Sequence, residues 1–141
     1  MSELSKILPV LSAVLLCDTA ATDPVSHKKS LIGIFDRMYV GKFPASRPIR
    51  VYVRLADAQG QYNLTIRLAK AADASALAEV KANFTVVDRR ASTDFVVPTY
   101  AYPFPEAGLY EFQVIANDSY LGAAALNVEL MPERERPGGQ A

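Results

Sequence analysis

The chain has 141 residues, of which half are hydrophobic and 21% are charged, and its 15 Lys and Arg residues balance its 15 Asp and Glu residues. This length suits one domain with its own core, and the balanced charge argues against recruitment of nucleic acid or an anionic membrane by an overall field. Because the chain has one Cys and one His, an internal disulfide and a zinc cluster of these residue types are excluded. No apolar run reaches the roughly 18 residues that a membrane-spanning helix requires.

The first apolar stretch, Ile7–Cys17, has two interpretations. It is either the apolar part of a signal peptide or a buried first strand. Glu3 weakens the positive start that Lys6 supplies, and Leu16 is bulky where a lipoprotein cleavage site requires a small residue. We therefore expect a strand and, with one unpaired cysteine, a cytoplasmic protein. Export is the alternative if residues 1–21 act as a signal peptide.

Three segments in the first half predict further strands. Ser30–Val40 is apolar on both faces, which indicates either a central strand covered twice or a strand whose outer face lies in an interface. Ile49–Leu55 and Tyr62–Leu68 alternate strictly between apolar and polar residues. The short DAQG break between them, with Gly60, predicts that they form a hairpin.

The second half continues in the same way. Ala78–Val86 alternates, although a helical turn at Ala74–Ala78 is an alternative because Ala, Leu, Glu and Lys favour helices. Pro98 marks the aromatic segment Thr93–Phe104 as an edge or bulged strand. The last two strands flank the NDS sequence, where Asn117 and Asp118 suit a tight turn: Tyr110–Ala116 and Leu126–Leu130.

Seven or eight strands without a long helix predict an all-β fold, a two-layer antiparallel β-sandwich. We expect one domain over residues 1–131 and a flexible tail over residues 132–141, where the sequence is rich in charge, Pro and Gly. Tyr110 follows a Pro-rich crossing and begins the penultimate strand. In immunoglobulin-like sandwiches a tyrosine at this place hydrogen-bonds back to the upstream loop, so we expect an immunoglobulin-like sandwich with such a corner.

Three segments resemble an uncharacterised family of short bacterial immunoglobulin-like β-sandwich proteins. They are VLLCD (residues 14–18), LIGIFDRMY (residues 31–39) with the following FP (residues 43–44), and FPEAGLYEFQVIANDSYLG (residues 104–122). The resemblance covers most of the chain. It implies that VLLCD is the first strand of a cytoplasmic protein, and it implies no catalytic residue.

Catalytic chemistry has little support in the sequence. Cys17 lies among apolar residues, which raise a thiol's pKa, and His27 falls in a polar loop, so we do not expect them to form a nucleophilic pair. No phosphate-binding or dinucleotide motif is present. Loop carboxylates leave a hydrolase or a calcium site as an alternative, with Asp18, Asp23, Asp36 and Asp118 as its candidate residues. We therefore predict that the protein is not an enzyme and has no catalytic, cofactor-binding or metal-binding residues.

Two surfaces are candidates for an interaction. The outward faces of the expected hairpin would join Arg50, Tyr52, Arg54 and Arg67 in one basic and aromatic patch. The doubly apolar strand, with Leu31 and Phe35 on its second face, would pack against a partner protein or a second copy in a homodimer. The alternative is a carbohydrate-binding or small-ligand-binding accessory domain, in which the stacking platform would be Tyr100, Tyr102 and Phe104.

Overall fold

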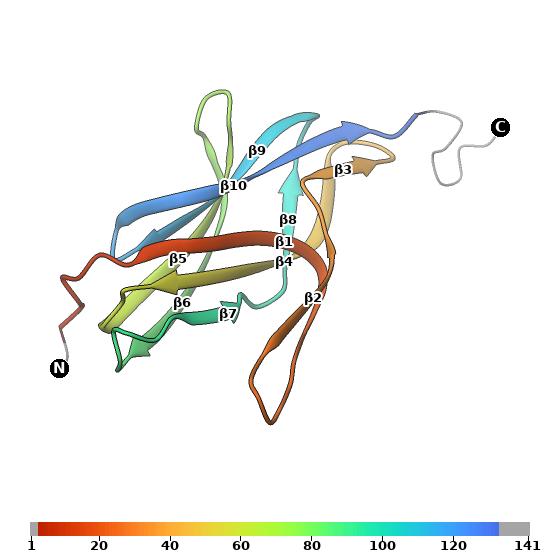
Figure 1. Ribbon diagram of the computed structural model, residues 1–141. Coiled ribbons are helices and arrows are strands. Elements are labelled where there is room, and N and C mark those ends of the chain that lie inside the picture. The colour runs from red at the N-terminus through yellow and green to blue at the C-terminus, as the bar shows by residue number, and fades with distance from the viewer. Residues whose placement is uncertain (1–2, 133–141) are drawn as a thin grey trace.

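The computed structural model describes residues 3–132, and these residues form ten strands in two sheets, with no helix among them (Figure 1). The strands of the first sheet lie in the order β2-β1-β4-β7, with β8 also paired to β4, and those of the second in the order β3-β10-β9-β5-β6. The predicted all-β, two-layer architecture is therefore confirmed. The strands are β1 (Val10–Thr22), β2 (Lys29–Ile34), β3 (Arg37–Val40), β4 (Ala45–Ala56), β5 (Gly60–Lys70), β6 (Ala76–Val86), β7 (Thr93–Val96), β8 (Tyr100–Phe104), β9 (Gly108–Ala116) and β10 (Ser119–Leu130).

The strand count exceeds the predicted seven or eight because two of the expected strands are each divided. Pro98 has no N–H to donate, and it separates β7 from β8, which both pair with β4. The segment Ser30–Val40 divides into β2 and β3, which lie in different sheets. The N–H of Phe35 still donates to Leu16 of the first sheet, whereas the carbonyl of Asp36 accepts from Asn127 of the second. Since β3 pairs with β10 in parallel, the sheets are mainly but not wholly antiparallel.

The connection between β4 and β5 is an arch between the sheets, so the predicted hairpin is wrong. β4 pairs with β1, β7 and β8, and β5 pairs with β6 and β9. The two strands direct their apolar side chains at each other across the core, and these are completely or almost completely buried: Val51, Val53 and Leu55 against Leu64, Ile66 and Leu68. Alternation shows which side chains of a strand are inward, and it is equally satisfied by stacked and by adjacent strands.

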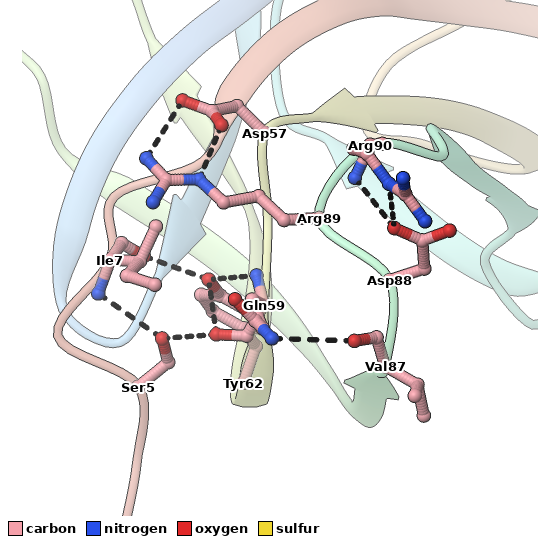
Figure 2. Close-up of polar contacts among 9 residues, drawn as sticks. All are labelled: Ser5, Ile7, Asp57, Gln59, Tyr62, Val87, Asp88, Arg89 and Arg90. Atoms are coloured by element: carbon pink, nitrogen blue, oxygen red, sulfur yellow. Dashed lines mark hydrogen bonds and ion pairs between the residues drawn. The ribbon is translucent and has the colours of Figure 1, made fainter.

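Side-chain hydrogen bonds close this end of the sandwich (Figure 2). The hydroxyl of Tyr62 donates to the carbonyl of Ile7 at 2.8 Å and accepts from the N–H of Gln59 at 3.0 Å. Arg89, in the loop after β6, donates through two nitrogens to the carboxylate of Asp57. The three-residue arch is therefore hydrogen-bonded to the segment before β1 and to the loop after β6.

The core between the sheets contains an aromatic cluster from both layers. Tyr102 packs edge-on against Phe112 with ring centroids 4.9 Å apart, and Phe104 does the same with Tyr110 at 5.1 Å. The hydroxyl of Tyr110 donates to the carbonyl of Glu106 in the crossing loop. The predicted tyrosine corner is therefore confirmed. Such a bond fixes the path of the chain as it passes from β8 in one sheet to β9 in the other.

Local predictions for the remaining segments were mostly correct. Asn117 and Asp118 have φ values of 48° and 68° and form the tight turn between β9 and β10. The helical alternative near Ala74–Ala78 is wrong, because β6 begins at Ala76. The predicted tail, residues 132–141, lies outside the described residues except for Pro132.

The N-terminal apolar run forms a strand, as expected. β1 lies between β2 and β4, with Leu16 and Cys17 buried. It pairs with β4 through Val10–Cys17 and with β2 through Cys17–Thr22. β1 is therefore an interior strand of the first sheet, and the apolar character of this segment is explained by its burial.

Candidate binding surface

The four residues of the expected basic patch do not lie together. Arg50, Tyr52 and Arg54 belong to β4 in the first sheet, and Arg67 belongs to β5 in the second. Because the two strands stack instead of pairing, their outward residues lie on opposite outer faces of the sandwich. The prediction of one continuous patch was therefore wrong.

The arginines of this set are also held by neighbours in their own sheets. Arg50 donates to the hydroxyl of Thr99, and Arg54 donates to the hydroxyl of Ser92 at 2.8 Å. Arg67 forms a salt bridge with Glu79 on the adjacent strand at 2.8 Å. Ser92 and Thr99 lie in the connecting segments beside β7 and β8, and Glu79 lies on β6. Exposed polar contacts of this kind contribute modestly to stability.

Tyr52 is the buried member of the set, with 8% of its surface exposed. Its hydroxyl donates to Oδ2 of Asp94 on β7 at 2.7 Å, and Nζ of Lys29 lies 3.3 Å from Oδ1 of the same carboxylate. Burial, followed by this hydrogen bond to Asp94, raises the pKa of Tyr52. Since Lys29 begins β2, Asp94 connects the β1–β2 hairpin to the opposite edge of its own sheet.

The second candidate, the segment around β2, places its apolar side chains differently from the prediction. Leu31 and Phe35 are half-buried, and Phe35 packs against the core. The exposed residues are Ile32, at 62%, and Ile34, at 55%. β2 is an edge strand of its sheet, so of the two predicted alternatives the covered central strand is wrong.

Two grooves flank the passage from β2 to β3. The larger, of about 590 Å³, has an apolar floor of Ile34, Phe35, Met38 and Ile49. Charged residues border it, namely Asp18, Arg37 and Arg47. The smaller, of about 440 Å³, lies between β1 and β10 and also includes Ile34 and Phe35. The two grooves and Tyr39, which is 46% exposed, form an apolar area with a charged border.

We call this area the crossover surface and define it by the side chains that the chain presents as it passes from one sheet to the other: Ile32, Ile34, Phe35, Met38 and Tyr39. Of these five residues the sequence prediction singled out Phe35, and the other four lie in the segment Ser30–Val40 that it described as apolar on both faces. The apolar character of both faces of Ser30–Val40 indicated an exposed apolar area. The sequence did not show which face is exposed, and in the structure the exposed residues of β2 include Ile32 and Ile34.

Gly33 has a local structural role at this surface. Its φ is +72°, and a Cβ built on it would lie 2.4 Å from Oδ2 of Asp18. Any larger residue would therefore be strained and would displace the Asp18 side chain. This close approach of β1 and β2 keeps Asp18 at the border of the larger groove.

The predicted stacking platform is wrong. Tyr102 and Phe104 are completely buried between the sheets, and only Tyr100 is exposed, at 42%. The three residues alternate on one strand, as expected, but Tyr102 and Phe104 belong to the core. A planar sugar ring needs an accessible aromatic face, which these two residues do not offer.

The residues with catalytic potential are not brought together. Cys17 is buried, burial raises the pKa of its thiol, and its Sγ lies 3.8 Å from the carbonyl of Arg50. His27 lies in the turn beyond the Thr22–Lys29 pair, at the other end of the β1–β2 ladder from Cys17. Within residues 3–132, no three His, Cys, Asp or Glu side chains are grouped so that they could hold a metal ion.

The fold and this surface define a class: a two-sheet β-sandwich with an exposed apolar area where the chain changes sheets. Residues 12–129 match a family described as a family of unknown function, DUF6941, and the chain belongs to that family. No curated protein matches the chain. Over the described part of the chain, no helix has the length and apolar character that crossing a membrane would require.

Proposed function

We propose that this protein is a non-catalytic module that binds another polypeptide through the crossover surface. The observation that carries the proposal is the exposure of Ile34 and Tyr39 at one apolar groove, with Ile32 exposed two residues before Ile34 on β2. Exposed apolar areas with a polar border are typical of protein interfaces. The border here includes Asp18, Arg37 and Arg47, which can orient a partner.

The non-catalytic part of the proposal is supported by the placement of the reactive groups. Cys17 is buried with a raised pKa, and His27 lies at the opposite end of the hairpin ladder. A nucleophile needs a base within hydrogen-bond reach, and this arrangement does not provide one.

Two finer assignments belong to the same proposal. The tyrosine corner at Tyr110 and the two stacked sheets support an immunoglobulin-like sandwich, elaborated by the division of two strands. A cytoplasmic location is supported by the interior position of β1, since removal of residues 1–21 would remove nearly all of this strand.

The proposal is tested by comparing the proteins that bind to matched variants. Ile34→Asp and Tyr39→Asp place a charge on the crossover surface. Arg67→Glu is the control, because Arg67 lies on β5, which β9 and β10 separate from β3, and is outside this surface. Each variant is immobilised, exposed to extract of the native cells, and the retained proteins are quantified by mass spectrometry.

We expect the set retained by the native chain to be retained by Arg67→Glu and reduced about tenfold or more by the other two variants. The proposal is wrong if all three variants retain the same proteins as the native chain. We expect each variant to fold, because the substituted side chains are exposed or half-exposed. Circular dichroism checks this.

A further inference from the structure

The larger groove lies beside a strand edge that has no partner. β3 is the last strand of the second sheet, and it pairs with β10 on one side only. The carbonyls of Asp36 and Val40 accept hydrogen bonds from the β10 side. Because the backbone groups of successive residues in a strand point to opposite sides, those of Arg37 and Tyr39 face away from β10. No described strand pairs with this free edge, and both residues line the larger groove.

The same groove continues the core of the sandwich towards solvent. Ile49 belongs to the core, Phe35 packs against it, and both lie in the groove floor. The wall opposite β3 belongs to the first sheet, where β4 begins and the β1–β2 hairpin passes. An extended backbone beside β3 would therefore add a strand to the second sheet and place its inward side chains on this apolar floor.

The border of the groove carries two charges of opposite sign that have no ion-pair partner. Arg37 forms a salt bridge with Glu129 at 3.3 Å. Asp18 on β1 and Arg47 on β4 are exposed, and neither forms a salt bridge with another described residue. A bound segment with one acidic and one basic side chain would complement both charges, and such complementarity selects one partner over others.

We propose that the larger groove binds an extended segment of another polypeptide, which pairs with the free edge of β3 and places an acidic residue at Arg47 and a basic residue at Asp18. The inference rests on the proposed function and names the kind of segment that the crossover surface binds. The backbone groups of Arg37 and Tyr39 supply the hydrogen bonds, the groove floor takes alternate apolar side chains, and the two charges select the sequence.

A phage-displayed library of short random peptides tests the two charges. We expect the native chain to select peptides in which apolar residues alternate with polar ones and which carry one acidic and one basic residue. Arg47→Glu should select a basic residue in place of the acidic one, and Asp18→Lys an acidic residue in place of the basic one. Lys81→Glu, on the edge strand β6 at the other end of the second sheet, is the control and should select the native set.

N-methylation of a selected peptide tests the strand pairing independently of its side chains. Only alternate N–H groups of an added strand can donate to β3, so methylation should weaken binding about tenfold or more at one set of alternate positions and little at the other. Amide hydrogen exchange at Arg37 and Tyr39 should slow when the peptide is bound, and exchange in β6 should stay the same.

The inference is overturned if the native chain selects no peptide, if the charge reversals leave the selected peptides unchanged, or if N-methylation acts equally at both sets of positions. Sedimentation equilibrium of the full chain should show a monomer. A dimer that Arg47→Glu disrupts would also overturn the inference, because the occupant of the groove would then be a second copy of this chain.

Failure of this inference is distinguishable from failure of the proposed function in the cell-extract experiment. If Ile34→Asp and Tyr39→Asp lose the retained proteins while Arg47→Glu and Asp18→Lys keep them, the segment assigned to the groove is wrong and the proposed function stands. If none of the four variants changes the retained proteins, both are wrong.

Discussion

At the scale of single residues, two buried tyrosines differ in whether the hydroxyl is hydrogen-bonded. Comparing them separates the contribution of the ring to stability from that of the hydroxyl. Tyr110 and Tyr102 are both almost completely buried in the core. The hydroxyl of Tyr110 donates to Glu106 O and accepts from Glu106 N–H at 3.3 Å. The hydroxyl of Tyr102 has no hydrogen-bond partner among the described residues. A buried polar group costs free energy unless it is hydrogen-bonded, so the same substitution should act differently at the two positions.

Tyr110→Phe should lower the free energy of unfolding by about 1 kcal/mol, since it removes the corner hydrogen bond and keeps the packing of the ring. Urea denaturation measures the change, and an unaltered m-value shows that the unfolding transition remains the same. Tyr120→Phe is the control, because this ring is 59% exposed. If both variants are as stable as the native chain, the corner contributes nothing to stability.

Tyr102→Phe should be neutral or stabilising at pH 7, because no hydrogen bond is lost. Burial raises the pKa of Tyr102 from 10.0 to about 12. The folded state therefore holds this proton to higher pH than the unfolded state, and the stability linked to it is fully present below pH 10 and is lost as the pH rises towards 12. Between these two pH values, the free energy of unfolding of the native chain should fall, and that of Tyr102→Phe should fall by about 2 kcal/mol less. Denaturation at several pH values measures both changes. Equal losses in the two proteins would contradict this assignment.

At the scale of elements, one carboxylate adds a contact between β2 of the β1–β2 hairpin and the strands β4 and β7 of the same sheet. Asp94 accepts from Tyr52 at 2.7 Å, lies 3.3 Å from Lys29 and lies 3.7 Å from Arg54. Three different elements meet at this side chain, namely β2, β4 and β7. Because β2 is an edge strand, this contact adds to its ladder with β1 in fixing the hairpin.

Asp94→Ala should lower the free energy of unfolding by about 1 kcal/mol, because the partly buried hydroxyl of Tyr52 loses its acceptor. It should also increase amide hydrogen exchange in the hairpin, residues 19–32, more than in β5 or β9. Glu79→Ala is the control: it removes a more exposed salt bridge, to Arg67, and should change stability by less than about 0.5 kcal/mol. An increase in amide exchange that is the same in all strands of Asp94→Ala would show that the contact does not hold the hairpin.

At the scale of the whole molecule, the first sheet depends on β1. This strand lies between β2 and β4, and its residues Leu16 and Cys17 are buried. Without β1, β2 would have no neighbour in the sheet, and β4 would lose its ladder partner from Arg50 to Ala56. An unpaired interior strand edge is costly, since its backbone groups lose their partners.

A chain of residues 22–141 should therefore lack cooperative unfolding and the β-type circular dichroism spectrum of the full protein. A chain that begins at Leu4 is the control, because it keeps the bridge between Leu4 and Gln61 and the contacts of Ser5. A cooperatively folded 22–141 chain would contradict the structural requirement for β1 and would favour the interpretation of residues 1–21 as a signal peptide.

Much of the fold follows from local alternation, which is a property of each segment alone. The inward residues of β5, from Tyr62 to Leu68, are buried as predicted, and the turn at Asn117 and Asp118 and the corner at Tyr110 occur where the sequence indicated. These features depend on side-chain periodicity and on short-range backbone preferences. They hold whichever strands become neighbours in the sheets.

Only the tertiary structure decided which strands pair and which stack. The same alternation in β4 and β5 is compatible with a hairpin and with an arch, and the arch separated Arg67 from Arg50. The change of sheet after Phe35 exposed Ile32 and Ile34 and buried part of Phe35, and packing between the sheets buried Tyr102. The sequence by itself determined the strands and their inward faces, because these depend on each segment's own apolar pattern. The candidate surface depends on contacts between segments far apart in the chain, and the pattern of one segment does not specify them.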